Sequence, residues 1–239
     1  MENRFRRRFG RSRAVLPVVH VEDLEQALRN AALAKQAGCP GIFLINHSTD
    51  YDSLLEIHHQ VYKEFPDWWI GVNCLDLSPV EVFPKVSDEV AGIWVDNARI
   101  DERAEATDQH QAEAIMEARE RSGWTGIYFG GVAFKYQRAV VDLTRAAQLA
   151  SRYMEIVTTS GPGTGLAADI QKIRTMKLGL GDSPLAIASG ITPENICKYL
   201  LHADAFLVAT GISSSFTEID PERLTALMQR VRAIGDVPV

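Results

Sequence analysis

The feature that most constrains the fold of this chain is a regular alternation of short apolar segments with stretches of helical spacing. The apolar segments are rich in β-branched side chains and lack the every-second-residue polarity of a strand with one solvated face. Strands buried on both faces and joined by helices form a parallel sheet with right-handed crossovers. The eight expected strands cover residues 15–19, 41–45, 69–73, 91–95, 125–129, 155–158, 185–188 and 205–209.

Eight such units in 239 residues match the size of a closed (β/α)8 barrel. A helix is expected after each strand, as in residues 22–37, whose apolar spacing ends at Gly38. Pro79, Pro193 and Pro221 each follow a Ser, Thr or Asp and indicate helix starts. An open doubly wound sheet is the alternative, but the number of units and the length favour closure. We therefore predict the α/β class, with one TIM-barrel domain over residues 14–239.

Residues 1–13 differ in charge from the rest of the chain. They contain six arginines and one acid, whereas the remaining residues carry 19 basic and 30 acidic side chains, a net charge of −11. Such a basic segment is typical of a solvated arm, and it can also contact nucleic acid or a membrane surface. We expect a flexible N-terminal arm or one that packs on an acidic partner subunit in a homo-oligomer.

Cysteine use and hydropathy bear on the compartment. Cys39, Cys74 and Cys197 lie far apart, without the spacing of a metal or redox motif. The arginine-rich segment has no apolar core of the kind found in secretory signals, and the apolar runs are too short to span a bilayer. We expect a cytoplasmic protein with reduced thiols and no membrane span.

Polar side chains follow the expected strands at their carboxyl ends, where barrel enzymes place their reactive groups. A buried carboxylate at this rim can act as a general base near neutral pH, and we predict this role for Asp96, which follows the fourth strand. Asn73, at the end of the third strand, is predicted to orient it. Lys135 is predicted to pair with a ligand anion or to stabilise an enolate. His20, at the end of the first strand, is a further catalytic candidate.

The last two strands end in residues suited to an anion. Ser189-Gly190 leaves the seventh strand and Thr210-Gly211 leaves the eighth. Glycine lets backbone N–H groups approach an anion closely, and barrels often bind phosphate between these two loops. We predict a phosphate site there, extended by Ser160-Gly161 after the sixth strand. The alternative is that the glycines only form tight turns.

The segment 158–165 after the sixth strand is rich in Gly, Ser and Thr. It lacks the lysine of a P-loop and the paired acids of phosphoribosyltransferases. It is expected to cradle a phosphate, to act as a lid, or to serve only as a connector.

Metal and Schiff-base chemistry are not expected. His20-Val21-Glu22 departs from the His-x-His of metal-dependent amidohydrolase barrels, and the sixth strand has no lysine of the class I aldolase kind. We predict neither a bound metal nor a cofactor.

Several of these strand ends resemble the BtpA family of TIM barrels, named for a photosystem I biogenesis factor. The clearest match is 184–195, which resembles the family's Gly-Ser-Gly-Val-Thr-Pro-Glu-Asn segment. The resemblance covers about residues 15 to 235 and implies a barrel fold. Ser213-Ser214-Ser215-Phe216 stands where the family has Lys-x-x-Gly. Further matches are 18–20, 71–75, 94–97 and the loop 158–165, and Lys135 lies near the family's Lys-His.

Three functions remain open from the sequence. The first is an isomerase, lyase or transferase that uses acid–base chemistry on a phosphorylated small molecule, such as a sugar phosphate or phosphoribosyl compound. The second is a non-catalytic assembly or regulatory barrel that binds a phosphometabolite or a protein partner. The third, nucleic-acid binding through the arginine segment, is the least favoured. The density of polar groups at one rim favours the enzyme.

Overall fold

The computed structural model describes residues 3–10 and 13–235 of the chain. Its strands form a closed parallel barrel in which each strand pairs with its neighbours in sequence and β8 pairs with β1. The predicted (β/α)8 TIM barrel is therefore confirmed, and the open doubly wound sheet is excluded. The strands are β1 (Ala14–His20), β2 (Gly41–Ile45), β3 (Trp69–Asn73), β4 (Gly92–Val95), β5 (Ile127–Gly131), β6 (Ile156–Ser160), β7 (Leu185–Ala188) and β8 (Ala205–Val208).

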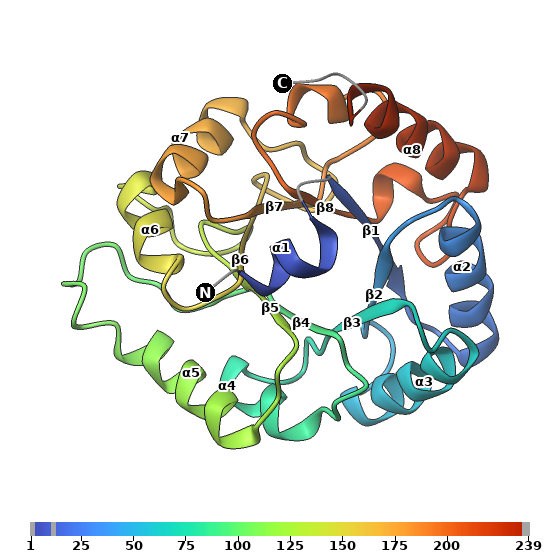
Figure 1. The fold of residues 1–239 in the computed structure, drawn as a ribbon, viewed down its shortest axis with the longest axis horizontal. Coiled ribbons are helices and arrows are strands. Elements are labelled where there is room, and N and C mark those ends of the chain that lie inside the picture. Colours follow the sequence, from blue (N-terminus) through green and yellow to red (C-terminus); the bar gives the residue numbers. More distant parts are fainter. Residues whose placement is uncertain (1–2, 11–12, 236–239) are drawn as a thin grey trace.

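Helices surround the barrel as an outer layer (Figure 1). No helix among the residues that the structure describes is long and apolar enough to cross a membrane. The helices of this layer are α2 (Leu24–Gln36), α3 (Tyr51–Glu64), α4 (Pro79–Val82), α5 (His110–Ser122), α6 (Leu143–Ala150), α7 (Ile170–Leu180) and α8 (Pro221–Gly235), with short 3-10 turns η1 (Phe83–Lys85), η2 (Ile196–Lys198) and η3 (Thr210–Ile212).

Two of the expected helices are much shorter than the sequence indicated. After β3, Pro84 lacks the N–H that a continuing α-helix needs, so α4 gives way to η1. After β7 only η2 forms. There the Asn195 side chain accepts from the Thr192 N–H (2.9 Å) and donates to the Gly190 carbonyl (2.7 Å), which closes a turn instead of a helix.

The expectation of a flexible basic arm needs correction. Residues Arg4–Phe9 form helix α1, which lies across the end of the barrel where the strands begin (Figure 1). Phe5 is fully buried, 6.1 Å from Phe129 between ring centroids, and Phe9 lies 5.4 Å from Trp69. The two phenylalanines close the bottom of the barrel, and this burial holds the helix in place.

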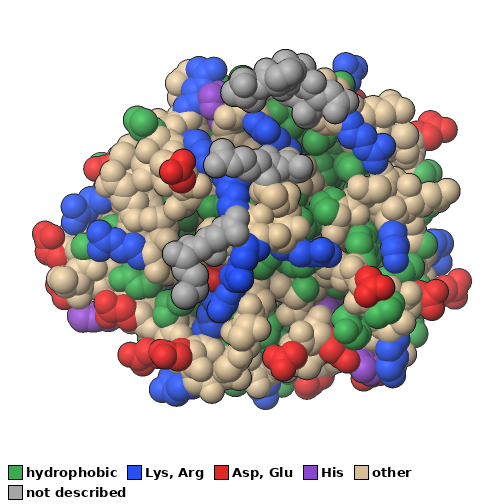
Figure 2. All heavy atoms as spheres, viewed as in Figure 1, with side chains coloured by type: hydrophobic (Ala, Val, Ile, Leu, Met, Phe, Trp, Pro, Cys, Tyr) green, Lys and Arg blue, Asp and Glu red, His purple; other side chains and the backbone are tan. Residues whose placement is uncertain are grey.

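The arginines of α1 lie on the outer face of that end of the barrel. Figure 2 shows a band of Lys and Arg side chains crossing the middle of this face. Arg6 pairs with Asp204 at 2.7 Å and Arg4 lies 3.6 Å from Glu155, whereas Arg7 and Arg8 are exposed. Part of the basic charge is therefore neutralised by acids of the barrel itself.

Strand alternation decides which side chains reach the mouth. One apolar cluster, including Leu16, Phe43, Trp69 and Phe129, fills the barrel interior, and a second packs between the strands and the helices. Successive side chains point to opposite faces of a strand, so residues two apart share a face. Steps of two residues along each strand, from the interior cluster toward the carboxyl end, lead to His20, Asn73, Asp96 and Ser160. These four side chains therefore face the inside of the barrel at its mouth.

Candidate functional site

The mouth of the barrel brings several of the predicted catalytic side chains together. Asn73 Nδ2 donates to Asp96 Oδ1 at 3.0 Å, which joins β3 to the end of β4. Burial raises the pKa of the Asp96 carboxyl, while the Asn73 hydrogen bond and the charges of Lys135 and His47 act to lower it. The net direction is upward, which suits a carboxylate that exchanges protons with a ligand.

His20 lies in a stack of rings on the β1 side of the mouth. Its ring centroid is 4.7 Å from His47 and 4.2 Å from Phe216, and its Nδ1 atom is buried without a partner among the described residues. Burial, with the nearby charges of His47 and Lys135, lowers the pKa of His20 to about 4. His20 is therefore neutral at physiological pH, and a neutral imidazole can both donate and accept a hydrogen bond.

Lys135 lies on a loop that is fixed to the end of β6. Its backbone N–H donates to Ser160 Oγ at 2.7 Å, and Ser160 Oγ donates in turn to the Gly161 carbonyl at 2.9 Å. The Ser160 hydroxyl is thus engaged within the protein. This arrangement makes Ser160 a support for the Lys135 loop.

A second lysine, which the sequence did not single out, supports the same loop. Lys172 Nζ, from the first turn of α7, donates to the carbonyls of Ala133 (2.5 Å) and Ser160 (2.7 Å). Burial lowers the pKa of Lys172 to about 8. Ala133 has a left-handed backbone with φ 50°, which is costly for a residue with a Cβ, and the lysine helps to hold it.

The loops after β7 and β8 lie directly against each other. A Cβ on Gly211 would lie 1.8 Å from the Ile191 carbonyl oxygen, so only glycine permits this contact. The backbone N–H groups of Gly190, Ile191 and Gly211 find no acceptor within hydrogen-bonding distance among the described residues, although all three residues are buried. The N–H groups of buried residues are usually paired, so three donors without an acceptor on two adjacent loops indicate room for an acceptor from outside the chain.

An open recess lies at the ends of β1 and β8. Its volume is about 350 Å³, and its walls include His20, Thr210, Ser213 and Phe216. Deeper in the barrel, on the inner face, the Trp94 indole N–H and the Thr158 hydroxyl are also buried without a partner among the described residues. The mouth therefore offers polar groups that a ligand or ordered water can satisfy.

The loop between β6 and α7 crosses the β5–β7 side of the mouth. Gly165 N–H donates to Ser189 Oγ at 2.8 Å, and Thr164 Oγ1 lies 3.3 Å from both Lys135 Nζ and the Tyr136 hydroxyl. A Cβ on Gly190 would lie 2.2 Å from the Leu166 carbonyl oxygen. The loop thus packs closely over the end of β7, at the place where a lid would lie.

Other polar residues of the rim serve the loops themselves. Asn46 Nδ2 donates to Asp76 Oδ1 at 2.6 Å, and Asp76 Oδ2 accepts from the Tyr51 N–H at 2.9 Å. In the parts of the chain that the structure describes, no three His, Cys, Asp or Glu side chains are grouped as metal ligands would be.

Comparison with known proteins places the fold among solved structures. Phosphoribosyl anthranilate isomerase from Thermus thermophilus is 17% identical, with 92% of this chain and 99% of that chain covered and a TM-score of 0.65. The tryptophan synthase alpha chain from Legionella pneumophila is 14% identical, with 99% of this chain and 100% of that chain covered and a TM-score of 0.68. A third structure is (S)-3-O-geranylgeranylglyceryl phosphate synthase from Thermoplasma acidophilum in complex with its substrate sn-glycerol-1-phosphate. It is 16% identical, with 95% of this chain and 96% of that chain covered and a TM-score of 0.66.

No protein-family model matches the chain. A search of curated proteins finds no match either. The sequence identity to each of these three structures is below 20%, so the likeness shows a shared barrel fold.

Proposed function

We propose that this protein is an enzyme that binds a phosphorylated small molecule at the ends of β7 and β8 and carries out acid–base chemistry at Asp96. The observation that carries the proposal is that the backbone N–H groups of Gly190, Ile191 and Gly211, three buried residues, have no acceptor among the described residues. Backbone N–H groups converging from two adjacent loops are the usual protein ligands of a phosphate at this place in a barrel.

The residues predicted for phosphate binding take different parts in this proposal. Gly190 and Gly211 supply backbone donors, and Ser189 and Thr210 flank them. Gly161 is the first residue of the β6–α7 loop and packs against Leu166 of the same loop, where a Cβ would lie 2.1 Å from the Leu166 carbonyl oxygen. The Ser160 hydroxyl accepts from the Lys135 N–H and donates its proton to the Gly161 carbonyl. In this proposal it supports the Lys135 loop and does not donate to the phosphate.

The chemical end of the ligand lies toward β3 and β4 in this proposal. Asp96 is the general base, because burial raises the pKa of its carboxyl and Asn73 holds one oxygen in place. Lys135 lies close enough for its charge to lower the pKa of Asp96, so the ammonium can stabilise negative charge that develops on the substrate. Proton abstraction beside a carbonyl, as in an isomerase or lyase, is the reaction class that these groups serve best.

The structural neighbours and the motif resemblance agree with this proposal. One neighbour holds sn-glycerol-1-phosphate, and another is named for a phosphoribosyl compound. We also propose that the chain is BtpA-like, on the strength of the segment 184–195 and the other strand-end motifs. A cytoplasmic location and a homo-oligomeric state complete the proposal.

Deuterium exchange tests the chemistry without a known product. The protein is incubated in D₂O with each member of a panel of aldose and ketose phosphates, and deuterium beside the carbonyl is followed by NMR. We expect exchange with at least one phosphorylated sugar, and a loss of about a hundredfold or more in Asp96→Asn. Asp76→Asn, at the same rim but bound to Asn46, is the control. Equal exchange rates in wild type and Asp96→Asn would remove Asp96 as the base.

A further inference from the structure

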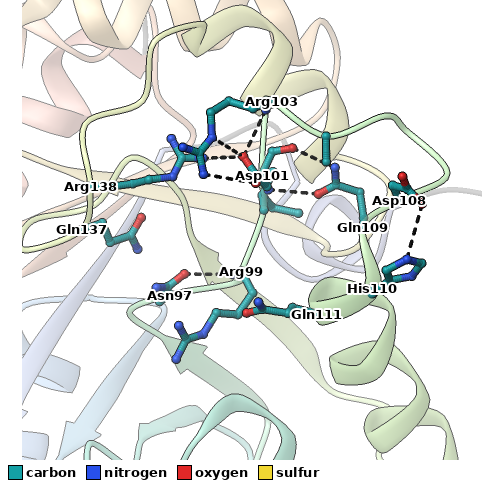
Figure 3. A pocket seen from close by; sticks show the side chains of 12 residues that line it. Asn97, Arg99, Asp101, Arg103, Asp108, Gln109, His110, Gln111, Gln137 and Arg138 are labelled. Atoms are coloured by element: carbon teal, nitrogen blue, oxygen red, sulfur yellow. Dashed lines mark hydrogen bonds and ion pairs between the residues drawn. The ribbon is translucent and has the colours of Figure 1, made fainter.

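A separate cavity lies beside the mouth, on the side of the barrel opposite β8. Its volume is about 370 Å³, and it is an open cavity lined by the loop after β4, the loop after β5 and the start of α5 (Figure 3). In the closed strand order, β4 and β8 lie four strands apart, across the barrel from each other. The cavity is therefore distinct from the free amides of the β7 and β8 loops.

Most of the charge around this cavity is already paired. Arg138 Nη2 binds Asp101 Oδ1 at 2.6 Å, and Arg138 Nη1 binds Glu102 Oε1 at 2.8 Å. The Glu102 side chain is 2% exposed, and its hydrogen bond with Arg138 lowers the pKa of Glu102 to about 2. Arg103 Nε contacts Asp101 at 3.1 Å. These ions form a fixed wall with little net charge.

The cavity is also lined by Asp108, whose Oδ1 lies 3.4 Å from His110 Nε2. Among the arginines in the described part of the lining, Arg99 differs from Arg103 and Arg138. No carboxylate among the described residues lies within ion-pair distance of its guanidinium. Its backbone is left-handed, with φ 61°, and Asn97 Oδ1 accepts from its N–H at 2.9 Å. Figure 3 shows the Arg99 side chain extending away from the Arg103–Asp101 pair, beside Asn97 and Gln111.

The unused groups around Arg99 favour a negatively charged ligand. The exposed guanidinium of Arg99 offers donors and no acceptor. The amide nitrogens of the half-buried Asn97 and the exposed Gln111 have no acceptor among the described residues. A guanidinium binds carboxylate or phosphate oxygens through paired, charge-assisted hydrogen bonds.

The cavity also adjoins the proposed base. Asn97 directly follows Asp96, and Gln137 Nε2 donates to the Asp96 backbone carbonyl at 2.6 Å. In the closed strand order Asp96 follows β4, next to this cavity, whereas Gly190 and Gly211 follow β7 and β8.

We propose that the Arg99 cavity is a second anion site, which selects substrates carrying a carboxylate or phosphate at the end opposite the first phosphate. This inference rests on the proposed function, because the first phosphate fixes the ligand at β7 and β8. It narrows the substrate class to compounds with two anionic ends, with the reacting carbon between them.

Binding of synthetic two-ended ligands tests this site directly. Isothermal titration compares ω-phosphonoalkanoic acids of increasing chain length with alkylphosphonates of the same length. We expect one length at which the added carboxylate tightens binding by about tenfold or more, as a charge-assisted hydrogen-bond pair provides. A series of α,ω-bisphosphonates shows whether the second group is better matched by a carboxylate or a phosphonate.

Variants assign the gain to Arg99. Arg99→Asn keeps a residue that tolerates the left-handed backbone and should abolish the gain from the second anion, while Arg99→Lys should keep part of it. Arg121→Asn, an exposed arginine near the end of α5, is the matched control and should change nothing. Thermal unfolding confirms that each variant is folded.

The outcomes separate this inference from the function on which it rests. Phosphonate binding with no gain from a second anion at any length, or a gain that survives in Arg99→Asn, overturns the Arg99 site alone. Wild-type protein that binds no phosphonate of either series overturns the proposed phosphate site as well.

Discussion

Asp96 couples the chemistry of the site to the stability of the fold. Its carboxyl is half-buried at the mouth and its pKa is raised, so the folded protein holds this proton more tightly than the unfolded chain does. The folded state therefore gains from Asp96 only at acid pH, and it loses that stability as the pH rises through the raised pKa. A buried carboxylate retained at such a cost is typical of a functional site.

This linkage predicts the behaviour of Asp96→Asn. The asparagine keeps the acceptor for Asn73 and removes the ionisation, so the variant should be more stable than wild type near pH 8. The gain should be about 1.4 kcal/mol for each unit by which the pKa is raised, and it should vanish near pH 4. Urea unfolding across this range measures the difference. A variant that is less stable than wild type near pH 8 would contradict the burial of an ionised Asp96.

The roles of some single residues could be predicted from the sequence, and those of others could not. Asp96 and Asn73 could be predicted to meet because strand ends of a parallel barrel converge at one rim. Lys172 and Arg99 could not, because their roles depend on how a helix and a loop fold back toward β5 and β4. Ser160 was predicted as a phosphate ligand, but nothing in the sequence indicates that its hydroxyl is occupied by the Lys135 N–H.

At the level of elements, the α1 helix is the clearest difference between sequence and structure. Six arginines in the first 13 residues indicate a solvated segment. Phe5 and Phe9, four residues apart, lie on one face of a helix, and this face fits the barrel bottom formed by Phe129 and Trp69. The partners of the two phenylalanines are more than fifty residues away, so the sequence pattern alone could not reveal them.

Truncation of Phe5 tests whether α1 is an integral part of the barrel. Phe5→Ala removes a fully buried ring and should cost about 3–5 kcal/mol of unfolding free energy, as phenylalanine truncations in protein cores do. Arg7→Ala, on the exposed side of the same helix, should change stability by less than about 0.5 kcal/mol. Denaturant unfolding of both variants provides the comparison. If Phe5→Ala lowers the unfolding free energy by less than about 1 kcal/mol, α1 is not an integral part of the barrel and the expectation of a flexible arm holds.

For the whole molecule, the repeated pattern of the sequence was enough to predict the closed barrel and the end that carries the candidate site. Eight short buried strands with helices between them leave few other arrangements. The lengths of individual helices were less predictable, because Pro84 lacks the N–H that would continue α4 and the Asn195 side chain closes a turn where a helix was expected. The chemistry of the site depends on which amides remain free after folding, and that is a property of the packed loops.

The most direct test of the account is a titration of ¹⁵N-labelled protein with inorganic phosphate, followed by amide NMR shifts. A phosphate site at the β7 and β8 loops predicts saturable shifts centred on Gly190, Ile191 and Gly211. These shifts should be lost in Gly190→Ala, where a Cβ would collide with the Leu166 carbonyl. They should be kept in Gly123→Ala, where φ is similar (72° against 71°) but the space around a Cβ is open. Saturable shifts elsewhere that leave these three amides unmoved, or no binding at all, would contradict the account.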